Sequence, residues 1–165
     1  MNAKNGKPWA PRASPKRPQT QTMYSPTWQA AYGNPTTADG AILCMERCRQ
    51  TGNPHYRGLV LKSADAYMTG EIDAGTADVW PAVPAHILSL MLFAYRETGD
   101  LQYLRRAQDL GRQAVGMFWD DGPLPRASTT CSQYETITGG PDLALALLEL
   151  HTMSTSRVAP KGPAR

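Results

Sequence analysis

A short turn motif occurs twice in this chain and limits the folds that the chain can adopt. The segments "CRQTGNPHYRGLV" (48–60) and "YRETGDLQYLRRA" (95–107) both contain Thr-Gly, then a small polar residue, then a Tyr four positions after the Gly. Aligning Gly52 with Gly99 gives an offset of 47 residues, at which apolar residues on both sides of the turn coincide. Self-similarity at a fixed period predicts a repeated structural unit.

The second copy predicts a helix, a tight turn and another helix. Residues 85–97 are apolar on nearly every face, which indicates a helix buried all round. Gly99 is expected to end that helix in a left-handed conformation, which glycine adopts freely. Asp100 then caps the amphipathic helix 101–118 by accepting a hydrogen bond from a free backbone N–H.

The first copy repeats this arrangement. A helix over 39–50 is expected to end at Gly52, and Asn53 is expected to cap the next one. Pro54 falls in the first turn, where its missing N–H costs nothing, and the helix is predicted to continue to about Met68.

A third apolar helix is predicted over 141–153, and no amphipathic helix follows it. The chain therefore contains two complete hairpins and one unpaired helix. Two long segments, 69–84 and 119–140, connect these units, and in an alternating array both are expected at the same end. Long loops in compact domains are uncommon unless they are functional, so a site is expected at that end.

Charge divides the chain into three parts. Residues 1–38 and 154–165 hold eight basic residues and no acid, whereas 39–153 hold all 14 acidic residues and nine of the 17 basic ones. We expect a disordered, Pro/Lys/Arg-rich tail at 1–38, an α-hairpin repeat domain at 39–153 and a flexible basic tail at 154–165. The folded part is five charges negative, so nucleic acid is an unlikely partner for it.

The apolar segments are short. Residues 1–38 lack the apolar run of a signal peptide, and the chain has no 18 consecutive apolar residues, so no membrane span is expected. Localisation stays unknown, with the cytoplasm as the default.

Three cysteines make a disulfide framework unlikely. Cys44 and Cys48 share one helix face, and with His55 and Cys131 they suggest a metal site only by composition, because no CxxC pair exists. We expect these cysteines to pack as small apolar residues, and we predict neither a metal nor another cofactor.

The second unit resembles a known family. The pattern Y-x-x-TGD-x-x-Y-L-x-x-A, which runs from Tyr95 to Ala107, and the following "FWDDG" are similar to the hairpins of α/α-toroid (six-hairpin) carbohydrate-active proteins. These include polysaccharide lyases and unsaturated glucuronyl hydrolases, and terpene-cyclase-type toroids use similar hairpins. The resemblance covers 39–153 and implies an all-α fold, a partial α/α toroid of antiparallel hairpins. A closed toroid needs about six hairpins, and no complete catalytic set carries over.

The two long connections hold the candidate site residues. Acid–base chemistry of a glycosidase needs two carboxylates, for which Asp78 and Asp121 are the candidates. A lyase instead needs a base and a cation that neutralises a substrate carboxylate, a scheme that Tyr134 and Arg126 fit. The candidate substrate-binding residues are Asp73, Trp80, Trp119 and Asp120.

Each of these residues also has a structural interpretation. Asp120, Asp121 and Gly122 form an ordinary turn sequence; Trp80 fits a plug over the core, and Tyr134 a buried ring with a satisfied hydroxyl.

Two functions follow from the sequence. The first is a partial toroid domain of a polysaccharide- or oligosaccharide-processing protein, with the chain as a fragment, a truncated reading frame or a stand-alone repeat. The alternative is a non-catalytic helical-repeat module that binds another protein through an exposed apolar flank. Candidate partners are therefore a saccharide, another protein or further hairpins of a larger chain.

Overall fold

The structure is a computed structural model that describes residues 36–72, 78–120 and 122–155. These ranges contain helices and no strand, so the predicted all-α class is confirmed. The elements are α1 (Thr37–Thr51), α2 (Pro54–Ala66), α3 (Ala82–Thr98), α4 (Leu101–Phe118), the short 3₁₀ helix η1 (Thr136–Thr138) and α5 (Gly140–Thr155). The predicted tails lie outside the described residues, apart from 36–38 at the start of α1 and 154–155 at the end of α5.

Both Thr-Gly turns have the predicted geometry. Gly52 and Gly99 are left-handed, with φ of 64° and 74°, and end α1 and α3. Asn53 and Asp100 each accept a hydrogen bond, through the side chain, from the backbone N–H two residues further on. Arg57, just after the first turn, forms an ion pair with Glu97, just before the second. The two turns therefore lie at one end of the molecule.

The first helix begins earlier than the predicted boundary at residue 39. Thr36 caps it: the Thr36 hydroxyl accepts from the Asp39 N–H at 3.2 Å, and the Thr36 N–H donates to the Asp39 carboxylate at 2.6 Å. This reciprocal pair is a capping box. Asp39 is thus the third residue of α1 instead of its first.

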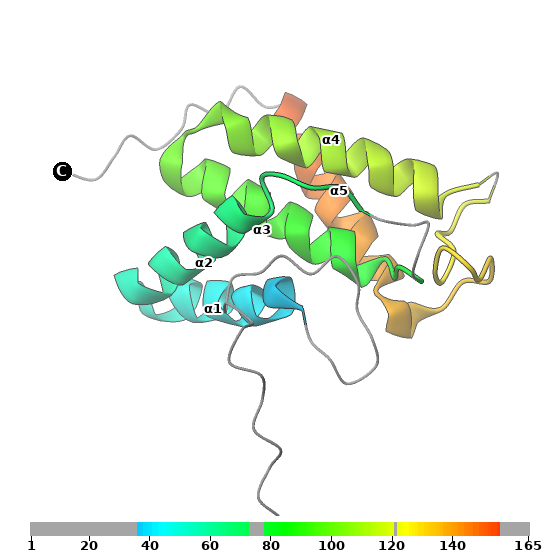
Figure 1. Ribbon diagram of the computed structural model, residues 1–165, viewed down its shortest axis with the longest axis horizontal. Coiled ribbons are helices and arrows are strands. Elements are labelled where there is room, and N and C mark those ends of the chain that lie inside the picture. Colours follow the sequence, from blue (N-terminus) through cyan, green and yellow to red (C-terminus); the bar gives the residue numbers. More distant parts are fainter. Residues whose placement is uncertain (1–35, 73–77, 121, 156–165) are drawn as a thin grey trace, which may run out of the picture.

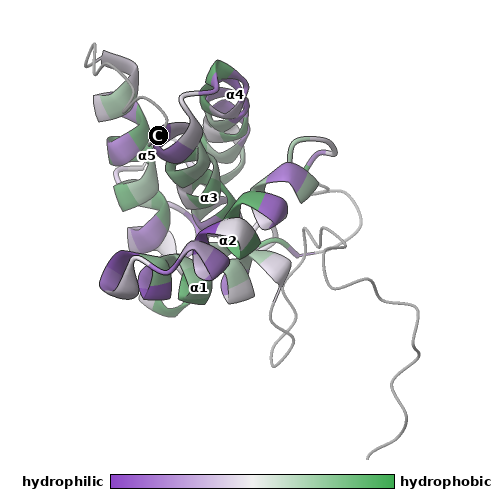
Figure 2. Ribbon diagram, turned by 90° about the vertical axis from the view of Figure 1, so that its left-hand side faces the viewer, coloured by the Kyte–Doolittle hydropathy of each residue, from purple (hydrophilic) through white to green (hydrophobic). Residues whose placement is uncertain are grey.

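Helix α3 is the centre of the fold. It packs against α1, α2, α4 and α5, and hydrophobic residues run along it in the middle of the molecule (Figures 1 and 2). Ten of its 17 residues are buried, on all faces, as predicted. Neither α3 nor any other helix in the described ranges is long and apolar enough to cross a membrane.

The two hairpins lie side by side. Helix α1 packs on α2, and α4 packs on α3. Between the hairpins, the Tyr103 hydroxyl of α4 donates to Asp65 of α2. Arg106 of α4 donates to the carbonyls of Tyr67 and Gly70, just beyond the end of α2.

Helix α5 follows as the unpaired helix, and it differs from α3. It packs mainly on α3, and its buried apolar side chains are Leu143, Ala146 and Leu150. Leu145 and Leu148 are 65% and 61% exposed. The reason is that within the described residues no second helix of a hairpin covers the other side of α5.

Candidate functional site

The two long connections meet at the end of the molecule opposite the Thr-Gly turns (Figure 1). The Thr129 N–H donates to the Val79 carbonyl at 3.0 Å, and the Val79 N–H donates to the Thr129 hydroxyl at 3.1 Å. The prediction that both connections emerge at one end is confirmed.

Asp78 belongs to this contact. Its carboxylate accepts hydrogen bonds from the Thr130 N–H at 3.3 Å and the Thr130 hydroxyl at 2.9 Å. Slight burial raises the pKa of Asp78, but hydrogen bonds from Ser128, Thr130 and Trp80 outweigh it and lower that pKa below the ordinary value. A carboxylate held in its ionised form is poorly suited to act as a general acid.

Arg126 is paired with another candidate. Its guanidinium forms an ion pair with Asp120, and its backbone N–H donates to the Phe118 carbonyl at 2.8 Å. The Arg126 side chain is 25% exposed, and its Nε is buried with no hydrogen-bond partner among the described residues. The guanidinium is thus already paired with a neighbouring carboxylate.

Tyr134 lies over the start of α5. A Cβ at Gly140 would be 3.0 Å from its ring, which shows how closely the ring covers that backbone. The hydroxyl accepts a hydrogen bond from Thr136 at 3.3 Å. Among the described residues no acidic or basic group bonds to this hydroxyl, so nothing there prepares it to take a proton.

The two tryptophans form parts of helix ends. Trp80 precedes α3, and its carbonyl accepts from the Val83 N–H. Trp119 ends α4, donates its N–H to the Val115 carbonyl at 3.0 Å and packs against the core. Both side chains are half-buried.

The candidate residues thus form separate groups. Asp78 bonds to Thr130, and Asp120 bonds to Arg126, but within the described ranges no hydrogen bond or ion pair joins these groups to each other or to Tyr134. Asp73 and Asp121 lie outside the described residues. The structure therefore tests neither the carboxylate pair nor a complete saccharide site.

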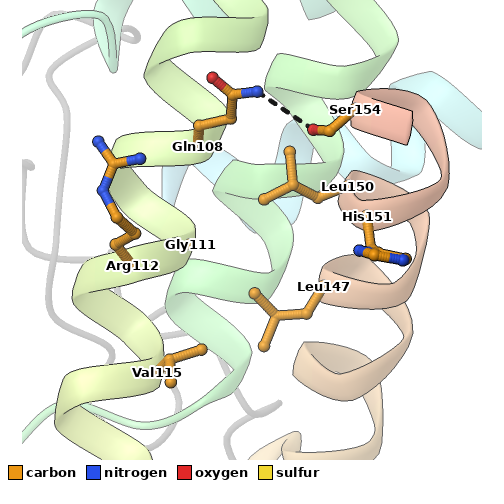
Figure 3. Close-up of a pocket in the computed structure, with 8 residues that line it drawn as sticks. All are labelled: Gln108, Gly111, Arg112, Val115, Leu147, Leu150, His151 and Ser154. Carbon is orange, nitrogen blue, oxygen red and sulfur yellow. Dashed lines mark hydrogen bonds between the residues drawn. The ribbon is translucent and has the colours of Figure 1, made fainter. Parts of the chain in front are cut away.

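A groove between α4 and α5 was not predicted. It is open to solvent and has a volume of about 580 Å³, and Figure 3 shows side chains from both helices along it. Gln108 donates to Ser154 across one end at 3.2 Å. Helix α5 comes close at Gly111, where a Cβ would be 2.7 Å from the nearest atom of Leu150. A glycine in the apolar stripe of α4 was the available sign of this close approach.

A second unpredicted contact joins α1 to α3. His86 Nδ1 lies 2.6 Å from the Asp39 carboxylate, and these two residues are one repeat period, 47 residues, apart. Partial burial raises the pKa of Asp39, but hydrogen bonds from His86 and Thr36 outweigh it, so the pKa lies below its ordinary value.

Tyr103 joins α4 to α2. Burial, with the hydrogen bond to the Asp65 carboxylate, raises the pKa of Tyr103 to about 12. The phenol therefore remains a hydrogen-bond donor at neutral pH and links the two hairpins.

Two of the three cysteines pack against the core as expected. Cys44 and Cys48 are free thiols, partly buried against the core. In the described part of the chain no three His, Cys, Asp or Glu side chains gather in a way that suits a metal ion.

Comparisons with protein-family models, curated proteins and solved structures found no match to this chain.

Proposed function

We propose that this protein is a non-catalytic helical-hairpin module that binds another protein through an apolar flank. The apolar flank consists of Leu145 and Leu148 on α5. The observation that carries the proposal is the contrast between α3 and α5. Both helices are rich in apolar residues, but α3 buries them on every side, and α5 leaves two leucines more than half exposed.

Exposed leucines on a regular helix favour association. Burying a leucine side chain contributes roughly 1.5–3 kcal/mol, and Leu145 and Leu148, three residues apart, lie on one side of α5. Helical arrays that end freely in water carry a polar outer face on their terminal repeats. Helix α5 departs from that pattern, as expected of a surface that another protein covers.

A photo-crosslinking experiment tests this function. A benzophenone amino acid at position 148 is expected to capture a defined partner in a cell extract. Leu145→Glu should prevent that capture while leaving the fold intact, because this side chain is exposed. The same amino acid at position 102, on the exposed start of α4, is the control site. Identical captures from positions 102 and 148, or capture unaffected by Leu145→Glu, would contradict the proposal.

A second candidate function is a partial α/α-toroid domain of a saccharide-processing protein, of the lyase or glycoside hydrolase type. Its support is the meeting of the two long connections, which brings Asp78 beside Thr130 and Arg126 beside Asp120 at one end. Trp80 and Trp119 are half-buried and lie close in sequence to Asp78 and Asp120. Their rings would supply flat faces for sugar rings.

Oligosaccharides test the second candidate. On this function a panel of acidic and neutral oligosaccharides is expected to raise the melting temperature of the protein or to be cleaved. Arg126→Ala should weaken the response to the acidic members, because it removes the cation that would pair with a sugar carboxylate. A panel with no shift and no cleavage would remove this candidate.

A further inference from the structure

The groove between α4 and α5 has an apolar interior and a basic edge. Gly111, Val115, Leu147 and Leu150 form the interior, and Arg112 and His151 stand at the edges (Figure 3). The described lining contains no acidic residue. Arg112 does form an ion pair with Asp109 on its own helix, but both side chains are more than half exposed, so this pair is weak and can exchange.

The repeat relates this groove to a contact that is already made elsewhere in the structure. At the 47-residue offset, the α4 residues of the groove correspond to residues of α2: Gln108 to Leu61, Gly111 to Ala64, Arg112 to Asp65 and Val115 to Met68. On α2 this face is reached by one side chain of α4, since Tyr103 bonds to Asp65. One repeat further on, the corresponding face of α4 borders the groove.

The corresponding place beside α4 and α5 is open in the described residues. Helix α4 lies against α3 and reaches α2 at Tyr103 and Arg106. A helix in the equivalent place would lie against α5 and reach α4 at Arg112. Its apolar face would cover Val115 and Leu147, as the apolar face of α4 covers α3.

The polar residue at this position is acidic on α2 and basic on α4. Asp65 is an acceptor and receives the hydroxyl of Tyr103, the third residue after the N-cap of α4. Its counterpart, Arg112, carries only donors and a positive charge, so the group that it can bind on a partner is an acceptor, and a carboxylate pairs with it best. The helix that fits the groove therefore has an acidic residue at this position.

From these contacts we propose that the α4–α5 groove binds an amphipathic helix of a partner protein, oriented as α4 is on α3, with an acidic side chain that pairs with Arg112. This inference goes beyond the proposed binding function, because the groove lies on a different side of α5 from Leu145 and Leu148. The occupant is a helix from another protein; a second copy of this chain is an outcome that the test separates.

The test uses peptides built on the chain's own outer helix. The probe is a peptide of residues 100–118 carrying Tyr103→Glu, and its counterpart carries Tyr103→Arg. Binding to the full-length protein is measured by fluorescence anisotropy. The Tyr103→Glu peptide is expected to bind the unmodified protein, and Arg112→Glu should weaken that binding about fivefold, the size of effect of a partly exposed charge pair. The Tyr103→Arg peptide should recover the lost affinity on the Arg112→Glu protein.

Two further variants show whether the peptide occupies the groove. Val115→Glu places a charge inside it and should abolish binding of both peptides; Val115 is 45% exposed, so the variant is expected to fold. Leu43→Glu, at a 70% exposed leucine of α1, is the matched control and should bind normally.

Three results would overturn the inference. These are no binding of either peptide, binding that Val115→Glu leaves intact, or equal binding with and without Arg112→Glu. Sedimentation of the protein alone adds a fourth: a dimer that Val115→Glu dissociates, and Leu43→Glu does not, would make a second copy the occupant. If the peptides fail but the position-148 crosslink persists, the proposed binding function stands and only this partner class is wrong.

Discussion

At the scale of single residues, two glycines with similar backbone angles have very different surroundings. Gly52 and Gly139 both have positive φ, at 64° and 88°. Nothing lies within 4 Å of the place of a Cβ at Gly52. At Gly139 a Cβ would be 2.5 Å from the Ala82 Cβ and 2.8 Å from the Ala82 backbone nitrogen. Gly139 thus allows the start of α5 to lie directly on the start of α3.

Substitution of the two glycines separates backbone strain from steric contact. We expect Gly52→Ala to lower the free energy of unfolding by about 1 kcal/mol, because only the left-handed backbone opposes alanine. Gly139→Ala should cost more, about 2–4 kcal/mol, because the new methyl group also meets backbone that cannot move aside. Urea unfolding followed by circular dichroism measures both values, and equal losses would contradict the contact at Ala82.

At the scale of secondary-structure elements, α3 and α5 have similar composition and unequal burial. Leu88 of α3 is completely buried, and Leu148 of α5 is 61% exposed. We predict that Leu88→Ala lowers the free energy of unfolding by about 2–5 kcal/mol, because it leaves a cavity in the core. Leu148→Ala should change it by no more than about 0.5 kcal/mol. A large loss for Leu148→Ala in the isolated protein would show that α5 is covered after all.

The elements that local chemistry determines were predictable. Gly99 and Asp100 end one helix and begin the next through their own backbone and side chain, so the range 101–118 could be predicted to the residue. The start of α1 was predicted too late, because Thr36 was not recognised as its N-cap. The capping box of Thr36 and Asp39 uses only neighbouring residues, so the sequence did contain this signal.

Contacts between segments far apart in the chain could not be predicted from the sequence. The bond between Thr130 and Asp78 joins residues 52 positions apart, and whether a connection binds substrate or binds its neighbour depends on such contacts. Which side of α5 is covered by α3 also depends on contacts between distant residues and could not be predicted. One sequence with two repeat units carries the period of the array but no direct information on these pairings, so the groove beside Gly111 was missed.

At the scale of the whole molecule, Asp39 joins the first hairpin to the second through His86. Its lowered pKa means that the folded state binds a proton there less readily than the unfolded state, whose value is 3.8. The associated stability is present above that pH and is lost as the pH falls through the folded value. We expect the protein to lose stability below about pH 4.

The variant Asp39→Asn tests this link. It should lower stability at pH 7 by about 1 kcal/mol, since it removes a charge that favours the start of a helix and bonds His86. It should also lose less stability than the unmodified protein between pH 5 and pH 3. These two pH values lie about one unit above and below the pKa of an aspartate in the unfolded chain. Urea unfolding at each pH gives the comparison, with Asp142→Asn at the start of α5 as the control. A constant difference between variant and unmodified protein at all pH values would refute the assignment.

The contact between Asp39 and His86 also limits how such an array can be copied. These residues occupy the same position in successive units. In an array of identical units, each of these positions would therefore contact a copy of the same residue. Two aspartates would repel each other, and a histidine in place of Asp39 would remove the carboxylate that caps α1. A protein engineer extending this array would therefore need alternating units, or one residue that bonds to its own kind, such as asparagine.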